Sequence, residues 1–296
     1  MPQAFDVPPN GLIDYQWILI RTGFTGDKWI QAFECRPGER AVVHHIGAFW
    51  RRPGSPWMAD AQPGVPIAKP TNTPETGASD GLVGDYVPGM PGLVFPPGYA
   101  MLLPAGADIM LQVHYTPNGK PARDISRVGF VFASEPPQHR VVNVGVTNMR
   151  FRIPPKDPNY RVDAQLTLGT EAQLLVLNPH MHVRGKAFEI RAVREGAEPE
   201  MLLRVPRYDF NWQLNYIPTD PLRFPAGTRL EATAWYDNSP NNPYNPDPQK
   251  EVGFGDQTSD EMMVGFLHLA VPAGTDMRKL FQRPAYTRLA AGTGTE

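Results

Sequence analysis

Prolines and glycines occur along the whole chain and keep its uninterrupted segments short, which restricts the folds that it can adopt. The 296 residues include 34 prolines and 27 glycines. Each proline removes a backbone donor and interrupts a helix, so long helices have few places to fit. Hydrophobic residues make up 41% and charged residues 20%, which is typical of a globular rather than a disordered chain. We therefore expect an all-β protein with many turns.

Apolar and aromatic residues recur with a period of two in short runs that turn formers separate. The predicted strands span residues 15–20, 28–35, 41–50, 107–115, 127–133, 140–146, 172–177, 187–193, 201–205, 210–216, 229–236 and 262–271. A Pro/Gly-rich stretch at about 53–100 is too long for an ordinary loop. We expect this stretch to be either a covering flap or a mobile segment.

A weak internal repeat indicates two similar halves. Residues 104–115 read PAGADIMLQVHY and residues 225–236 read PAGTRLEATAWY, at an offset of 121 residues. This offset is about the length of one β-sandwich domain. His114 in the first copy corresponds to Trp235 in the second, so the strand itself does not require the histidine. We predict two tandem antiparallel β-sandwich domains, at 1–153 and 154–296.

Charge, cysteine content and the N-terminal sequence limit the classes of protein. The net charge of −2, without a basic block, does not favour a nucleic-acid partner. No apolar run has the length of a membrane span. The single cysteine, Cys35, excludes an internal disulfide, and we expect it to be buried on its strand. No signal peptide opens the sequence, so the protein is either cytoplasmic or separated from an export signal or an upstream domain.

Two histidines stand one residue apart in NPHMHVRGK, residues 178–186. If the preceding strand continues, Asn178, His180, His182 and Arg184 share one face, because side chains two apart point the same way. Two imidazoles about 7 Å apart on one face can converge on a metal ion. The alternative is a surface strand with two exposed histidines.

Other histidines lie in the first half of the chain. His44 and His45 are adjacent and would point to opposite faces, unless a bulge or strand end lets both bind one ion. His114 shares a strand face with Gln112, and a lone strand histidine is usually bonded to a backbone carbonyl. We expect His139 to be a solvated turn residue and His268 to lie in the core or at its rim.

Met262 and Met263 open the last predicted strand, in TSDEMMVGFLHL. Methionine on a strand is usually part of the core. A thioether joined to two imidazoles would instead make a mixed site of two nitrogens and one sulfur. Such a set suits Cu(I) and disfavours zinc, magnesium or iron.

The order HH, QVHY, HMH followed by GK, and then DEM resembles the copper type II, ascorbate-dependent monooxygenases, the family of peptidylglycine α-hydroxylating monooxygenase and dopamine β-monooxygenase. The resemblance implies two jelly-roll-like sandwiches that face each other across a solvent-filled cleft. It also implies two coppers per chain, the first held by His44, His45 and His114 and the second by His180, His182 and Met262, with Met263 as the alternative to Met262.

The resemblance further implies an enzyme that hydroxylates a C–H bond with dioxygen and ascorbate or a similar one-electron donor. Substrate and dioxygen would meet at the second copper, while the first copper would store the second electron. Gln112 would either orient a ligand or a bridging water at the first copper or be an ordinary polar residue of the cleft.

The sequence also departs from the family pattern. One cysteine cannot supply the disulfides that cross the well-known animal members. In the peptide-hydroxylating branch, an arginine before the HxH motif and polar residues after the methionine grip a substrate carboxylate. The corresponding positions here carry Asn178, Val264 and Phe266. We therefore expect an apolar or aromatic small substrate rather than a C-terminal glycyl peptide.

Two alternative functions remain open. A copper-binding or electron-transfer module without hydroxylase activity would use the same ligands. A β-sandwich adhesion or carbohydrate-binding protein would use exposed aromatic residues, such as those in YDFNWQLNY, as a sugar platform. The family is secretory and cells keep free copper low in the cytoplasm, so we expect a periplasmic or extracellular location. The expected partners are a small-molecule substrate and dioxygen, with room for an upstream redox domain.

Overall fold

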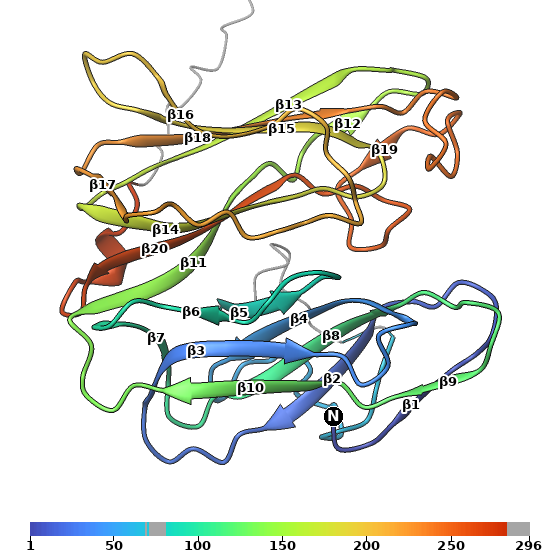
Figure 1. Cartoon of the computed structure of the whole chain (residues 1–296), viewed down its shortest axis with the longest axis horizontal. Coiled ribbons are helices and arrows are strands. Elements are labelled where there is room, and N and C mark those ends of the chain that lie inside the picture. The colour runs from blue at the N-terminus through green and yellow to red at the C-terminus, as the bar shows by residue number, and fades with distance from the viewer. Residues whose placement is uncertain (69, 71–80, 283–296) are drawn as a thin grey trace, which may run out of the picture.

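The computed structural model describes residues 1–68, 70 and 81–282. Its regular structure is almost entirely β-sheet and forms two layered blocks (Figure 1). The one helix among the described residues is a short 3-10 turn, η1 (Met277–Lys279). Nothing helical in these ranges has the length and apolar character needed to cross a membrane. The all-β prediction is confirmed.

The N-terminal half packs a four-stranded antiparallel sheet against a second layer. The first sheet has the order β2-β8-β4-β5, with β2 (Gln16–Arg21), β8 (Asp108–Tyr115), β4 (Val43–Arg51) and β5 (Gly81–Tyr86). The second layer contains β10 (Arg127–Phe132), β3 (Lys28–Arg36), β7 (Tyr99–Leu103) and β6 (Leu93–Val94). Buried residues of both layers, such as Ile46 and Leu111 from the first and Ile30 and Leu103 from the second, form one hydrophobic core.

The C-terminal half repeats this arrangement. Its outer sheet has the order β13-β18-β15-β16, with β13 (Tyr160–Thr167), β18 (Arg229–Tyr236), β15 (Gly185–Val193) and β16 (Glu200–Val205). The facing layer contains β11 (His139–Thr147), β20 (Val264–Pro272), β14 (Ala172–His180) and β17 (Leu222–Phe224). A second core, with Leu177, Phe188 and Leu267, lies between them.

The layer of the N-terminal half that contains β7 and the layer of the C-terminal half that contains β11 join into one continuous sheet. Strand β11 pairs in parallel with β7, with His139 opposite Tyr99, and antiparallel with β20 along its whole length. Two small sheets pair β1 (Phe5–Val7) with β9 (Ala122–Asp124) and β12 (Arg152–Ile153) with β19 (Val252–Gly253). The boundary at 153/154 stays a prediction, and we note that β11 lies before it while pairing with a strand of the C-terminal half.

The internal repeat read from the sequence corresponds to equivalent strands. Strands β8 and β18 hold the second position in their sheets, and each follows a glycine at positive φ, Gly106 at 70° and Gly227 at 87°. The register of β4 on β8 shifts between Val43 and His45. The register of β15 on β18 shifts between Gly185 and Ala187. His44 therefore occupies the same bulge position as Lys186, which follows from the shared layout of the two halves.

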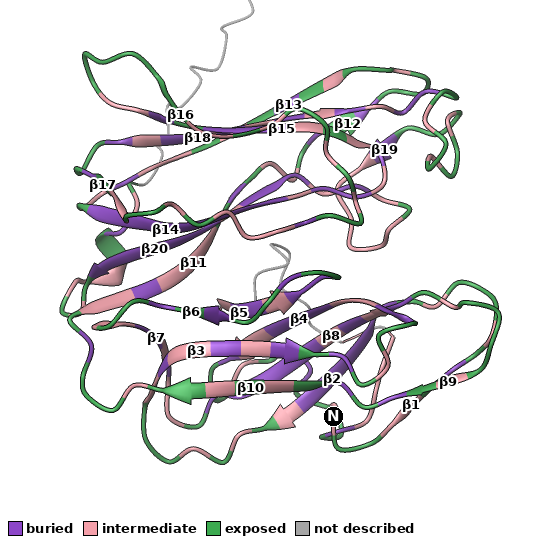
Figure 2. Cartoon of the chain, in the orientation of Figure 1, coloured by how far each residue is buried: buried purple, intermediate pink, exposed green. Residues whose placement is uncertain are grey.

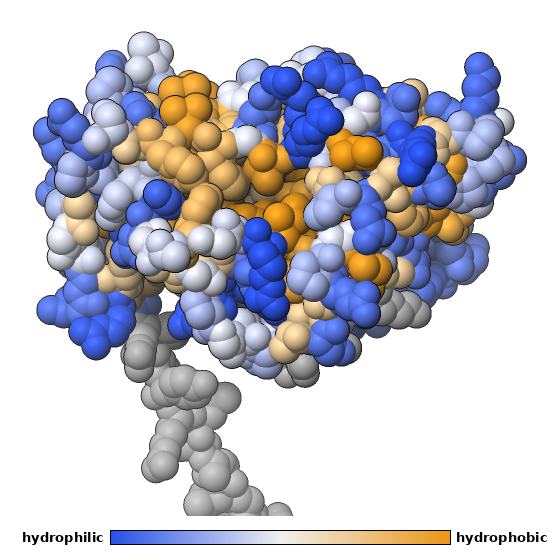
Figure 3. Space-filling view, turned by 90° about the horizontal axis from the view of Figure 1, so that it is seen from below, coloured by the Kyte–Doolittle hydropathy of each residue, from blue (hydrophilic) through white to orange (hydrophobic). Residues whose placement is uncertain are grey.

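Burial follows the layers. In Figure 2 buried residues are concentrated on strands such as β14 and β20, which lie between other layers, whereas β10 at the outside is largely exposed. Figure 3 shows apolar side chains gathered in the middle of one face, with polar side chains around them. A modest apolar area of this kind is ordinary for a globular protein.

Some sequence expectations about strands were wrong. Residues 210–216 form no strand, and Tyr216 makes only an isolated bridge to Leu177. The stretch 53–100 was expected to be a covering flap or a mobile segment, but its described part contains β5, β6 and part of β7, which belong to the sheets of the N-terminal half. Trp57 and Met58, in the same stretch, are buried in a small separate core with Trp17. Residues 69 and 71–80 of this stretch lie outside the described residues.

Candidate metal sites

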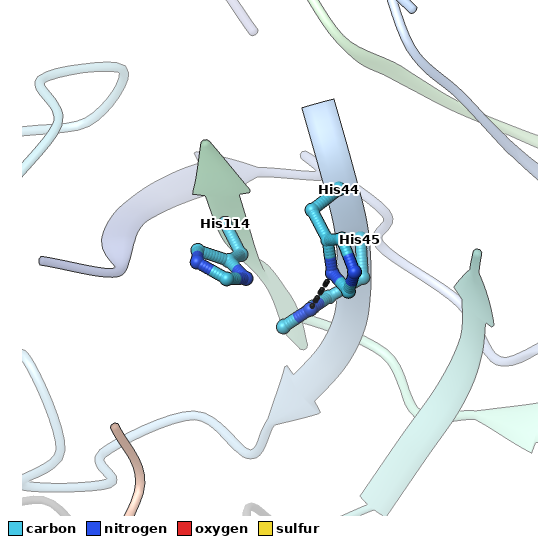
Figure 4. A group of neighbouring side chains, drawn as sticks. All are labelled: His44, His45 and His114. Carbon is cyan, nitrogen blue, oxygen red and sulfur yellow. Dashed lines mark hydrogen bonds between the residues drawn. The ribbon is translucent and has the colours of Figure 1, made fainter. Parts of the chain in front are cut away.

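Three histidines of the N-terminal half meet where β4 begins and β8 ends. The bulge at the start of β4 brings His44 and His45 together, and the register places His45 opposite His114. One ring nitrogen from each of the three residues lies within 4.8 Å of the others. Figure 4 shows the imidazoles turned toward one another. Sequence reasoning had required a bulge or strand end here, and the strand supplies both.

Hydrogen bonds orient these imidazoles. The Nε2 of His44 lies 3.2 Å from the Oδ1 of Asn211, which can only accept, so His44 carries its hydrogen on Nε2. The Nδ1 atoms of His44 and His45 are 3.4 Å apart. The Nδ1 of His114 is buried and has no hydrogen-bond partner among the described residues. The Nδ1 atoms of His44 and His45 thus bond to each other in the metal-free chain, while that of His114 is left without a hydrogen bond among the described residues.

Burial keeps the three-histidine group neutral. It lowers the pKa of His114 to about 3, with a further contribution from the nearby His44. Burial and the neighbouring histidines lower the pKa of His45 well below its ordinary value. Burial also lowers the pKa of His44. Neutral imidazoles have the lone pair that a metal ion needs.

His180 and His182 form a second group in the C-terminal half. Strand β14 ends at His180, so the expected extension of the strand to Arg184 is wrong, yet the two rings lie 5.3 Å apart. The Nδ1 of His180 donates to the Oε1 of Gln213 at 2.6 Å. The Nδ1 of His182 donates to the carbonyl oxygen of Asp260 at 3.2 Å. Both bonds leave Nε2 as the free nitrogen.

The second group is also neutral. Burial lowers the pKa of His180 to about 4 and that of His182 to about 3. The repulsion of His180 adds to the lowering at His182.

The two methionines have different surroundings. Met262 is half-buried and lines the same cavity as His180 and His182. Met263 is fully buried in the core of the C-terminal half. Of the two methionines, Met262 is therefore the one that shares a cavity with His180 and His182.

A buried carboxylate holds the backbone of this region. Glu261 has no exposed surface and accepts hydrogen bonds from the backbone N–H groups of His182 at 2.9 Å and Arg184 at 2.7 Å. The Arg184 guanidinium lies 3.9 Å from the same carboxylate. Burial raises the pKa of Glu261 to about 8, although these donors favour the ionised form. Glu261, the residue before Met262, thus fastens the turn that carries His182 to the segment that carries Met262.

A cavity of about 420 Å³ lies between the two halves and reaches both histidine groups. Its lining includes His45 from the first group together with His180, His182 and Met262. Most of the remaining wall is apolar, with aromatic side chains from Trp17, Phe49, Tyr86 and Phe266. Asp85 is the carboxyl on the N-terminal wall, and burial raises its pKa to about 7.

The structure brings together all six predicted ligand residues, in two groups that reach one cavity. Val264 and Phe266 line the cavity, as expected for an apolar wall beside Met262. Asn178 is buried and donates to the Oδ1 of Asn215. Gln112 also lines the cavity.

The remaining histidines lie apart from the two groups. His139 is not a solvated turn residue, because it begins β11 and stacks on Tyr99 at 4.4 Å. His268 is a core residue whose Nε2 lies 2.9 Å from the Nδ2 of Asn143. Cys35 is buried, as predicted.

Sequence reasoning missed the residues that support the ligands. Phe210, Asn211 and Gln213 were assigned to a strand, because their alternation of aromatic and polar residues imitates one. Glu261 belongs to the DEM motif, but nothing in the sequence indicated that it holds the turn that carries His182. Tyr15, whose ring lies 4.6 Å from that of His114, belongs to no sequence motif that would have indicated this contact.

The residues present fit copper. The donor set of the second group is two imidazole nitrogens and one thioether, which Cu(I) prefers over harder ions. The first group has three neutral imidazoles with ring nitrogens within 4.8 Å of one another, and the buried Nδ1 of His114 has no hydrogen-bond partner in the described part of the chain. Each group also has the outer hydrogen bonds that fix ligand tautomers in metal sites.

One protein-family model matches the second half of the chain. Residues 140–282 match the family model described as copper type II ascorbate-dependent monooxygenase, C-terminal domain. The predicted family is thereby confirmed for this part of the chain. It contains β11 to β20 and the second histidine group. The comparison with curated proteins gave no match.

Among solved structures, the chain is similar to two from infectious bursal disease virus. The structure of the Gt strain is 10% identical over 94% of this chain and 73% of that chain, with a TM-score of 0.25. The VP2 subviral particle is 10% identical over 94% of this chain and 72% of that chain, with a TM-score of 0.24. Likeness at this level carries no argument about fold or function.

Proposed function

Because residues 140–282 match the C-terminal domain of the copper type II ascorbate-dependent monooxygenases, we propose that this chain is a copper-dependent monooxygenase. It hydroxylates a C–H bond of a small apolar or aromatic substrate, using dioxygen and an ascorbate-like one-electron donor. The single observation that carries the proposal is the convergence of two separate sets of neutral ligands on one cavity.

Two copper ions per chain fit these sets. His44, His45 and His114 would hold one ion, and His180, His182 and Met262 would hold the other. When bound, copper supplies one-electron redox chemistry and a place where dioxygen reacts. The thioether of Met262 favours the reduced ion at the second site.

The protein's own side chains bind and orient rather than transfer protons. Gln213 and the carbonyl of Asp260 hold His180 and His182 with Nε2 free. Asn211 accepts from the Nε2 of His44, so the Nδ1 of His44 carries the lone pair. The imidazoles stay neutral near neutral pH, because burial lowers their pKa values. These imidazoles therefore do not have to be deprotonated by another side chain before they bind a metal ion.

The cavity supports a small substrate with an apolar body. Its volume of about 420 Å³ is in the range of small-molecule sites. Val264 and Phe266 stand where a carboxylate-gripping site would need polar groups, and Asn178 is engaged elsewhere. Aromatic rings along the wall favour an apolar or aromatic ligand.

Copper counts in three variants test the ligand assignment. His182→Ala should abolish hydroxylation and lower the copper content from two toward one per chain. His114→Ala should keep copper at the second site but stop multiple turnover. His139→Gln, remote from the cavity, is the control and should keep both ions. Two tightly bound coppers in His182→Ala would refute the assignment, whereas copper without any hydroxylated product would favour an electron-transfer module.

The proposed chemistry favours a location outside the cytoplasm, in the periplasm or the extracellular space. Free copper is scarce in the cytoplasm, and the copper type II monooxygenases that the chain resembles are secretory. An upstream redox domain could serve as reductant. Cell fractionation of the native protein tests the location, with recovery in the cytoplasmic fraction as the contrary result.

A further inference from the structure

The loop between β16 and β17, residues 206–221, touches both histidine groups. We call it the connecting loop. It belongs to the C-terminal half, where the hydroxyl of Tyr208 accepts from the backbone N–H of Met181 at 2.9 Å and donates to its carbonyl at 2.7 Å. Further along, Tyr216 exchanges two backbone hydrogen bonds with Leu177. The loop is therefore tied to β14 and its end on both sides of its tip.

The tip of the connecting loop reaches the N-terminal half. The ring of Phe210 stacks on that of His44, with centroids 4.7 Å apart and planes at 17°. Asn211, the next residue, accepts from the Nε2 of His44. A turn in which Asp209 accepts from the backbone N–H of Asn211 at 2.8 Å fixes the direction of this pair. These two contacts set both the plane and the tautomer of His44.

The same tip also reaches the second group. Gln213, which is buried, accepts from the Nδ1 of His180 at 2.6 Å. Its amide nitrogen donates to the carbonyl of Phe210 at 2.7 Å. The ring of Phe210 lies edge-on to His182, with centroids 6.1 Å apart. One side chain, Gln213, thus bonds at one end to the second histidine group and at the other to the residue that stacks on the first.

We propose that the connecting loop couples the two histidine groups, with Phe210, Asn211 and Gln213 as positioning residues. A continuous path of contacts runs from His180 through Gln213 and Phe210 to His44. Displacing the loop at one group therefore reorients the imidazole at the other. This inference rests on the proposed function only for its consequence, the joint preparation of two copper sites. The coupling itself is a property of the metal-free chain.

The consequence for metal binding follows from the role of outer hydrogen bonds. Removing the partner of a metal-ligating histidine costs roughly 10- to 100-fold in metal affinity. Asn211→Ala should therefore weaken Cu(II) binding at the three-histidine group, and Gln213→Ala should weaken it at His180 and His182. Coupling adds a second effect, because each variant should also weaken the distant group, severalfold and by less than the near one.

The decisive test uses metal-free protein, with nitrogen NMR of the histidine rings as the readout of tautomer. In Gln213→Ala the signals of His44, which Gln213 does not touch, should move from a single tautomer toward a mixture. Phe210→Ala should alter His180 in the same way, and Phe210→Tyr should restore the native signals. Trp212→Ala is the control, since Trp212 lies between Asn211 and Gln213 but its side chain is 60% exposed.

Unchanged His44 signals in Gln213→Ala, together with unchanged His180 signals in Phe210→Ala, would overturn the coupling. The result is separate from the proposed function. Coupled imidazoles in a protein that takes up no Cu(II) would support the loop's role and end the monooxygenase assignment. Two bound Cu(II) ions, in a chain where variants at one group leave the tautomers of the other unchanged, would support the monooxygenase assignment and end the proposed coupling.

Discussion

Replacing each of the adjacent methionines by alanine should affect a different property, stability for Met263→Ala and the sulfur ligand of copper for Met262→Ala. Met263 is fully buried in the core of the C-terminal half. Truncating a buried methionine costs about 2–5 kcal/mol, through lost burial and the cavity that remains. In a domain of this size each kcal/mol lowers the Tm by about 2–4 °C. Met263→Ala should therefore lower the Tm of the metal-free protein by about 4–20 °C.

Met262→Ala should barely change stability. The side chain is half-buried against a cavity, so its truncation costs about 1 kcal/mol. The backbone carbonyl that accepts from the Tyr236 hydroxyl is kept. The variant should instead lose sulfur from the reduced copper, whereas Met263→Ala should retain it.

Thermal unfolding of metal-free protein and X-ray absorption of reduced, copper-loaded protein measure the two effects. The reasoning fails if Met263→Ala loses the sulfur ligand while Met262→Ala keeps it. It also fails if the two variants have the same stability.

Two further predictions concern the supports of the ligands. Glu261→Gln should destabilise the protein by about 1–3 kcal/mol, because the amide nitrogen of glutamine faces a backbone donor that the carboxylate accepted. It should also reduce copper at His182 without affecting His114, and equal copper loss at both would show a general unfolding instead. Copper binding at about pH 6 should release almost no protons. The pKa values of His114, His180 and His182 lie at about 3, 4 and 3, and an imidazole whose pKa is well below the pH is already neutral. Calorimetry in two buffers of different ionisation enthalpy measures this, and release of about two protons per chain would contradict the burial of the ligands.

The sequence predicted the fold class because its signals are local. Strands such as β18 were predicted with their observed bounds, since alternation and turn residues are properties of short segments. The pairing of β7 with β11 was not predictable, because only three residue pairs join the two halves there. Strand β5 was missed because it lies within a Pro/Gly-rich stretch whose composition resembles a loop.

The proposed ligand residues were easier to single out from the sequence than the residues that contact them. Histidines and methionines have few reasons to recur in such motifs, so His180 and His182 stood out. Phe210 and Gln213 did not, because an aromatic residue and an amide are common everywhere, and their role depends on a loop that crosses to the other half. The distinction between Met262 and Met263 also needed the structure, since a shift of one residue reverses which of them faces the core.

The most direct test of the account is the copper content and X-ray absorption of the reduced wild-type chain. The account predicts two copper ions per chain, coordinated by imidazole nitrogen, with a sulfur ligand on one of the two. One ion or none, or two ions without sulfur at either, would contradict the claim that His44, His45 and His114 form one site and His180, His182 and Met262 the other.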